Sequence, residues 1–133
     1  MYKLLIVDDE EMIVDWLFEL FQEVDEIELD VYRAYSGDEA IALLNKIKID
    51  VVLTDIRMPG MDGLELLKRI RQNWPDCRVI FLTGYNEFNY VYTAIQYEGV
   101  RYLLKTEDDE AIIDAVKNAV KDIENSLQVE KLI

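Results

Sequence analysis

Histidine is absent from the 133-residue sequence, and its absence removes several kinds of chemistry. Without an imidazole the chain has no Ser–His–Asp triad, no histidine metal ligand and no histidine that could carry a phosphoryl group. Carboxylates, hydroxyls and lysines must therefore supply any reactive groups. Cysteine occurs once, at Cys77, which excludes an internal disulfide and any cysteine cluster for a metal.

Positive charge is also scarce, with 14 Lys and Arg against 28 Asp and Glu and a net charge of −14. This balance argues against direct binding to nucleic-acid phosphates or to an anionic membrane, and it suits a metal cation or a basic partner. No apolar run approaches the ~18 residues of a membrane span, and the N-terminal apolar run is too short for a signal peptide. We therefore expect no membrane association and a cytoplasmic location.

What the sequence does contain is 51% hydrophobic residues, enough for the core of one compact domain. Short aliphatic runs alternate with helical patterns five times. The predicted strands cover residues 3–7, 29–35, 51–53, 78–82 and 102–104. The predicted helices cover residues 12–21, 36–47, 62–74, 86–97 and 106–127. This alternation predicts an α/β fold with a parallel sheet and helices on both faces.

Two features concern the ends of the predicted helices. Ser36 and Glu39 have the spacing of a capping box, in which Ser36 caps the helix and Glu39 bonds back to the capping residue. The last helical pattern is longer than one domain needs. We therefore expect a domain over residues 1–124, followed at 125–133 by a helical extension or the start of a linker.

Reactive or coordinating side chains follow four of the strands, namely Asp8 and Asp9, Asp55, Thr83 and Lys105. The carboxyl ends of parallel strands lie at one edge of a sheet, where such folds bind ligands. Each residue also has a plain structural interpretation. The acids can cap a helix or open a turn, the threonine can be a turn hydroxyl, and the lysine can be solvated. Those separate interpretations do not account for their occurrence at a single edge.

Three carboxylates within ~4–6 Å of one another repel, and a divalent cation would relieve that repulsion. A few hard oxygen ligands favour Mg²⁺, which binds one or two carboxylates together with a phosphate oxygen. One carboxylate can then act as a nucleophile and form an aspartyl phosphate. Lys105 would neutralise the phosphoryl oxygens and the Thr83 hydroxyl would donate a hydrogen bond to one of them.

Four sequence motifs resemble the receiver domain of bacterial two-component response regulators over residues 2–124. They are Val-Asp-Asp-Glu, Thr-Asp-Ile-Arg-Met-Pro-Gly-Met-Asp-Gly, Leu-Thr-Gly and Tyr-Leu-Leu-Lys, in that order along the chain. The resemblance implies a doubly wound (βα)5 flavodoxin-like sandwich, with a five-stranded parallel sheet of order 2-1-3-4-5. It also implies a signalling module that is not an enzyme beyond its own phosphorylation and dephosphorylation.

The resemblance also assigns roles to individual residues. It makes Asp55 the phosphoacceptor, and it makes Asp8 and Asp9 the acidic pair that binds Mg²⁺ together with Asp55 and the backbone carbonyl of Arg57. The switch residues and the phosphate-contacting lysine match Thr83, Tyr102 and Lys105. On phosphorylation, Thr83 would move inward and Tyr102 would rotate from an exposed to a buried position.

The implied partner is a sensor histidine kinase, whose phosphohistidine is the phosphoryl donor. The implied output surface comprises the fourth helix, the fifth strand and the fifth helix, which could also form a homodimer when phosphorylated. A Tyr-Asn-Glu-Phe run resembles receivers fused to AraC-type DNA-binding domains. We therefore expect control of transcription through an effector domain outside this chain. The alternative is a stand-alone receiver that acts by docking or phosphorelay.

One departure from the family and two other classes of protein bear on this interpretation. The family usually has Lys-Pro after the fifth strand, whereas this chain has Lys105-Thr106, for which we expect a trans peptide bond. An aspartate-nucleophile phosphatase normally has a second acid two residues after the nucleophile, where this chain has Arg57. A nucleotide binder of the same topology would need a phosphate cradle after the first strand, where this chain has acids.

Overall fold

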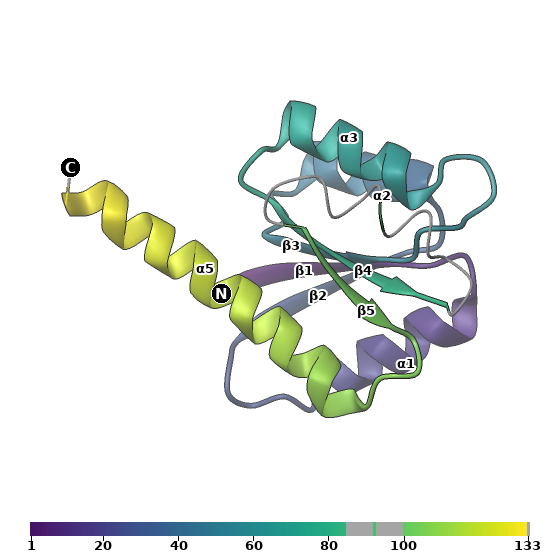
Figure 1. Ribbon diagram of the computed structural model, residues 1–133, viewed down its shortest axis with the longest axis horizontal. Helices are drawn as coiled ribbons and strands as arrows, with labels where there is room; N and C mark the ends of the chain where they lie inside the picture. Colours follow the sequence, from purple (N-terminus) through teal and green to yellow (C-terminus); the bar gives the residue numbers. More distant parts are fainter. Residues whose placement is uncertain (85–91, 93–99, 133) are drawn as a thin grey trace.

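The computed structural model of the protein describes residues 1–84, residue 92 and residues 100–132. Its five strands form one parallel sheet of order β2-β1-β3-β4-β5, which confirms the predicted doubly wound topology (Figure 1). The strands are β1 (Tyr2–Val7), β2 (Leu29–Ala34), β3 (Val51–Thr54), β4 (Arg78–Thr83) and β5 (Arg101–Leu104). The helices are α1 (Glu11–Gln22), α2 (Gly37–Lys46), α3 (Gly63–Asn73) and α5 (Asp109–Leu132). The helix predicted over residues 86–97 lies outside the described residues, apart from Tyr92.

Two hydrophobic cores lie on opposite faces of the sheet, one under α1 and α5 and the other under α2 and α3 (Figure 1). Successive residues of a strand point to opposite faces, so β1 contributes Leu4 and Ile6 to the first core and Leu5 and Val7 to the second. The central strands are buried on both faces, as their continuous aliphatic sequences predict. The two packed layers hold the carboxyl ends of these strands in fixed positions.

The beginnings of two helices differ from the prediction. The Ser36 hydroxyl accepts a hydrogen bond from the Glu39 amide at 3.1 Å, but the Glu39 carboxylate accepts from the Tyr35 amide at 3.3 Å and not from that of Ser36. Only half of the predicted capping box is therefore formed. Helix α5 begins at Asp109, not near residue 106, because the Asp108 carboxylate caps it by accepting from the Ala111 amide at 2.9 Å.

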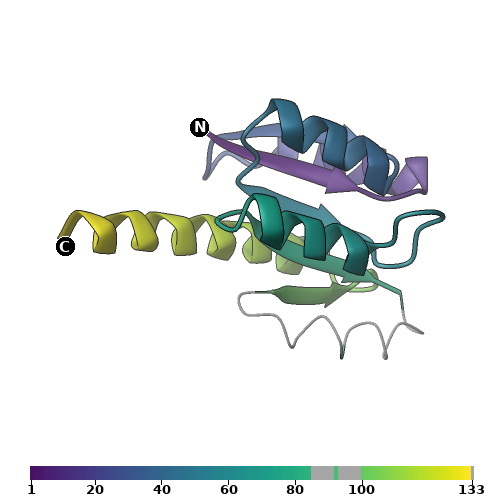
Figure 2. The same cartoon turned by 90° about the horizontal axis from the view of Figure 1, so that it is seen from above.

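Helix α5 extends well past the sheet. Its first half packs on the core through Ile112, Val116 and Ala119, and its second half projects beyond the amino ends of the strands (Figures 1 and 2). The helix continues without a break through residue 124, so the expected division into 1–124 and 125–133 remains a prediction. In the described part of the chain, no helix is long and apolar enough to cross a membrane.

Candidate functional site

The candidate site is built where two neighbouring strands end in register. Val7 of β1 pairs with Thr54 of β3, so the next residues, Asp8 and Asp55, leave the sheet side by side. The Asp55 amide donates to the Val7 carbonyl at 2.9 Å, and the Asp8 amide donates to the carbonyl of Ala34 at 3.3 Å. Both aspartates are therefore held by the sheet's own hydrogen bonds at its carboxyl edge.

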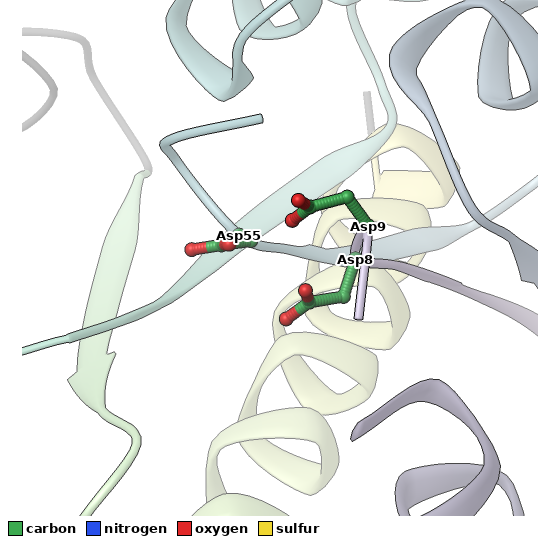
Figure 3. Close-up of side chains that lie close together, drawn as sticks. All are labelled: Asp8, Asp9 and Asp55. Atoms are coloured by element: carbon green, nitrogen blue, oxygen red, sulfur yellow. The ribbon is translucent and has the colours of Figure 1, made fainter. Parts of the chain in front are cut away.

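Three carboxylates converge at this edge. Asp8, Asp9 and Asp55 each offer an oxygen, and these oxygens lie within 4.8 Å of one another (Figure 3). Asp8 and Asp55 are only 2% and 6% exposed, whereas Asp9 is exposed to solvent. This set of hard oxygen donors, partly buried and open on one side, fits a divalent cation that also keeps water ligands.

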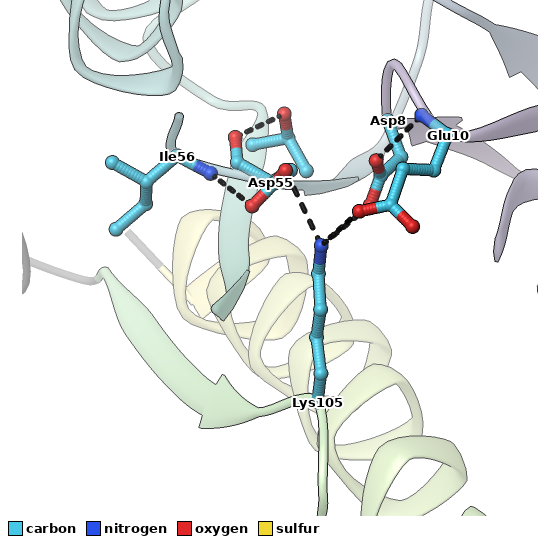
Figure 4. A network of polar contacts seen from close by, with 6 residues as sticks. Asp8, Glu10, Asp55, Ile56 and Lys105 are labelled. Atoms are coloured by element: carbon cyan, nitrogen blue, oxygen red, sulfur yellow. Dashed lines mark hydrogen bonds and ion pairs between the residues drawn. The ribbon is translucent and has the colours of Figure 1, made fainter. Parts of the chain in front are cut away.

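Lys105 is the cation that faces these acids. It follows β5, and its amide donates to the Thr83 carbonyl at 2.7 Å, which aligns it with the end of β4. Its Nζ lies 3.1 Å from Asp8 Oδ2, 3.3 Å from Asp55 Oδ2 and 3.9 Å from Glu10 Oε1 (Figure 4). One ammonium therefore serves several carboxylates, and the site keeps a surplus of negative charge.

The backbone fixes the remaining oxygens of the two buried aspartates. Asp55 Oδ1 accepts from the Ile56 amide at 2.8 Å, and Asp8 Oδ1 accepts from the Glu10 amide at 2.9 Å (Figure 4). In each case the second oxygen is the one that approaches Lys105. The two carboxylates are thus oriented before any ligand binds.

Burial and mutual repulsion disturb the ionisation of these groups. The pKa of Asp55 is raised from 3.8 to about 6, because burial and the charge of Asp8 raise it by more than Lys105 and the Ile56 amide lower it. The pKa of Asp8 is also raised, chiefly by burial. Burial lowers the pKa of Lys105, but the charges of Asp55 and Asp8 outweigh it and raise that pKa overall. Added positive charge would therefore stabilise the ionised site.

Gly63 lets the next helix approach this edge, a role that its place in the sequence did not reveal. A Cβ at Gly63 would lie 2.4 Å from the Asp55 carbonyl oxygen and 2.8 Å from the Cα of Ile56. The Gly63 amide donates to the Ile56 carbonyl at 2.6 Å, so the first turn of α3 closes directly on the residues around Asp55. The Asp62-Gly63 pair indicated only a helix start.

Comparison with known proteins identifies the family of this chain. The family model for the response regulator receiver domain matches residues 4–117, which is most of the chain. The chain is a receiver domain. The family assignment accords with the four motifs and the sheet order.

Curated relatives of this receiver domain are longer regulators. The transcriptional regulatory protein YesN of Bacillus subtilis is 33% identical over 92% of this chain, which covers 33% of YesN. The positive alginate biosynthesis regulatory protein of Pseudomonas aeruginosa is 38% identical over 88% of this chain, which covers 46% of that protein. The chain therefore spans about a third to a half of the length of these two relatives.

Solved structures agree with the fold. A two-component transcriptional regulator AraC from Clostridium phytofermentans superposes with a TM-score of 0.84 and 35% identity, covering 94% of this chain and 97% of that one. NtrX from Brucella abortus superposes with a TM-score of 0.88 and 26% identity, covering 100% of this chain and 30% of NtrX. The receiver domain is thus similar both to an isolated domain and to part of a longer chain.

The other residues singled out in the sequence lie around the acidic cluster. Thr83 is the last residue of β4 and is fully buried, and its hydroxyl has no hydrogen-bond partner in the part of the chain that the structure describes. Tyr102 is 47% exposed on β5. Arg57 is exposed two residues after Asp55. The Lys105–Thr106 peptide bond is trans, as expected, and no described peptide bond is cis.

Proposed function

We propose that Asp55 of this receiver domain accepts a phosphoryl group from the phosphohistidine of a sensor kinase. The observation that carries the proposal is the surrounding of Asp55, a buried carboxylate that lies 3.3 Å from the Lys105 ammonium and within the cluster of three acids. A turn residue of purely structural function would not need a second buried acid and a lysine beside it.

In the proposed reaction, a carboxylate oxygen of Asp55 attacks the phosphorus atom. The new O–P bond forms as the P–N bond to the kinase histidine breaks, and the leaving imidazole recovers a proton. Asp55 must be ionised to attack. Its pKa is raised to about 6, which still leaves it charged at neutral pH. Because phosphoryl transfer depends mainly on positioning and charge neutralisation, the fixed orientation of Asp55 is its main contribution.

Mg²⁺ is the metal that this donor set suits. Asp8, Asp9 and Asp55 would hold it, together with the backbone carbonyl of Arg57. When bound, the ion supplies positive charge that offsets the acids and the transferred phosphoryl oxygens. The chain's own residues then orient the nucleophile.

Lys105 and Thr83 would respond to the phosphoryl group. Lys105 already lies beside Asp55 Oδ2, so it can pair with a phosphoryl oxygen after a small movement. The buried Thr83 hydroxyl lacks a partner in the described residues and would gain one by donating to the phosphoryl group. Tyr102 would then turn inward on β5 and change the surface formed with α5, and this surface could mediate homodimerisation.

The proposed output is transcription, controlled through an effector domain beyond this receiver. The two curated relatives named above are described as regulatory proteins, and this chain covers only part of each. The cell compartment that suits such a system is the cytoplasm. A stand-alone receiver that docks onto a partner or passes on its phosphoryl group is the second candidate.

Intact-mass spectrometry tests the proposal directly. The protein is incubated with Mg²⁺ and acetyl phosphate, and we expect one added phosphoryl group in the wild type and none in Asp55→Asn. Asp50→Asn is the matched control, because it makes the same change at the other end of β3 and should still be phosphorylated. An unmodified wild-type protein would contradict the proposal. Repeated turnover of a phosphate ester without a phosphorylated intermediate would favour a phosphatase.

A further inference from the structure

We propose that Glu10 is a positioning residue that shares Lys105 with the buried aspartates and thereby raises the metal affinity of the acidic cluster. The inference rests on the proposed metal-binding role of Asp8 and Asp55. It concerns this chain's own ion pairs, and it assigns a function to a carboxylate that the proposed reaction leaves unused.

Several carboxylates compete for the ammonium of Lys105. The ammonium lies 3.1 Å from Asp8 Oδ2 and 3.3 Å from Asp55 Oδ2, and both aspartates belong to the cluster suited to a metal. A cation that binds to these aspartates repels the ammonium and weakens its ion pairs with them. Any other acceptor for the ammonium makes that weakening less costly.

Glu10 is that acceptor. Its Oε1 lies 3.9 Å from the ammonium, and its side chain is 65% exposed, so it is not confined by packing (Figure 4). Glu10 is the N-cap residue of α1, yet its side chain makes no capping hydrogen bond. Its amide donates to Asp8 Oδ1 at 2.9 Å. The backbone of Glu10 therefore orients Asp8. The carboxylate of Glu10 faces Lys105, whose ammonium competes with a metal ion for Asp8.

Glu11 provides a natural comparison. It is also exposed and carries the same charge one residue further along, at the first position of α1. Its contacts in the described structure do not include an ion pair with Lys105. Removing the charge of Glu11 changes only the general electrostatic field, whereas removing that of Glu10 also leaves Asp8 and Asp55 as the remaining ion-pair partners of the ammonium among the described residues.

Binding of Mn²⁺, followed by the electron paramagnetic resonance signal of the free ion, tests this coupling without phosphorylation. We expect Glu10→Gln to weaken Mn²⁺ binding about two- to five-fold, the range given by exposed ion pairs, and Glu11→Gln to have a smaller effect. Lys105→Gln should tighten binding because the competing ammonium is gone. In the Lys105→Gln background, Glu10→Gln should weaken binding no more than Glu11→Gln does.

Two results would overturn the inference. An equal effect of Glu10→Gln with and without Lys105 would mean that Glu10 acts on the metal directly. An effect in the wild-type background no larger than that of Glu11→Gln would leave Glu10 with no special role. Urea unfolding of each variant checks that the fold is intact. Absence of Mn²⁺ binding by the wild type would overturn the inference together with the metal-dependent part of the proposed function, whereas normal binding without phosphorylation would contradict the proposed function alone.

Discussion

Strand β3 has an aspartate immediately before it and another immediately after it, and the two residues differ in almost everything except side-chain chemistry. Asp50 lies at the amino edge, where its carboxylate accepts from the Lys3 amide at 2.8 Å and its carbonyl accepts from the Arg78 amide at 2.9 Å. Asp55 lies at the carboxyl edge and faces Asp8 and Lys105. Asp50 extends the hydrogen bonding of the sheet, whereas the Asp55 side chain faces charged groups.

The surroundings of the two edges explain this difference. Asp50 lines an open hollow of about 580 Å³ together with Trp74, Arg78 and the projecting part of α5. Polar contacts across that edge, such as Arg78 Nη2 to Ser126 Oγ at 3.2 Å, involve exposed groups. At the other edge, Asp8 and Asp55 are buried together and share one lysine. The same residue type thus bonds to the sheet's backbone at one edge and is crowded by a second buried acid at the other, which is the basis for proposing Asp55 as the reactive one.

The largest effect on stability should come from filling the space beside Asp55. Gly63→Ala places a Cβ against the Asp55 carbonyl, and we expect it to lower the free energy of unfolding by about 3 kcal/mol. The matched control is Gly37→Ala, also at the first position of a helix. There the new Cβ would lie 2.8 Å from Met61 Cβ and 2.9 Å from its Cγ and Sδ, a clash with one side chain and not with backbone atoms, so we expect a smaller loss of about 1 kcal/mol.

Urea unfolding provides the measurement for both variants. Equal losses for Gly63→Ala and Gly37→Ala would contradict the view that α3 closes tightly on the carboxyl end of β3. A small loss for Gly63→Ala would mean that the backbone around Asp55 can shift to make room for the new Cβ. The main structural contrast with Asp50 would then be lost.

The next prediction compares how pH changes the stability of variants at Asp55 and Asp50. Because burial raises the pKa of Asp55 from 3.8 to about 6, the folded state holds its proton more tightly than the unfolded state. The resulting stabilisation is present below about pH 4 and is lost as the pH rises through about 6. Asp55→Asn should therefore be more stable than the wild type by about 1–3 kcal/mol at pH 7.5, with little difference at pH 4.

Asp50→Asn is the control for this experiment, since an amide oxygen can still accept from the Lys3 amide. Its stability should differ from the wild type by less than about 1 kcal/mol at pH 7.5. Urea denaturation at the two pH values, without added metal, gives the comparison. If Asp55→Asn shifted stability equally at pH 4 and pH 7.5, the ionisation of Asp55 would not be its cause.

The smallest effect concerns two threonines near the same edge. Thr83→Val removes a fully buried hydroxyl that has no partner among the described residues, and we expect about 1 kcal/mol of added stability. Thr54→Val removes a hydroxyl that donates to the Asp55 carbonyl at 2.9 Å, and we expect a loss of about 1 kcal/mol. Thermal unfolding of both variants measures the signs, and a loss in Thr83→Val would show that its hydroxyl is already satisfied.

Much of the fold could be predicted because its determinants are local. Continuous aliphatic runs predict the buried strands, and helical periodicity predicts the helices α1, α2, α3 and α5 that the structure describes. Several acids near residue 106 suit the start of α5 equally well in the sequence, and only the hydrogen bond from the Ala111 amide to Asp108 shows which residue caps the helix. In the same way, Glu39 has the spacing of a capping box, but its carboxylate bonds to Tyr35.

The site could be anticipated only in part. Topology alone brings Asp8, Asp55 and Lys105 to one edge, so their proximity follows from the order of the strands. The contacts of Gly63 and Glu10 depend on how loops close in space, and the one-dimensional pattern carries no such information. The role of Gly63 follows from its distance to Asp55, and that of Glu10 from its distance to Lys105.

The central claim is that Asp55, and not another acid of the cluster, receives the phosphoryl group. Reduction with borohydride converts an aspartyl phosphate to homoserine, and peptide mapping then identifies the modified residue. After treatment with Mg²⁺ and acetyl phosphate, we expect homoserine at position 55 alone. Homoserine at position 8, 9 or 50, or none at all, would contradict it.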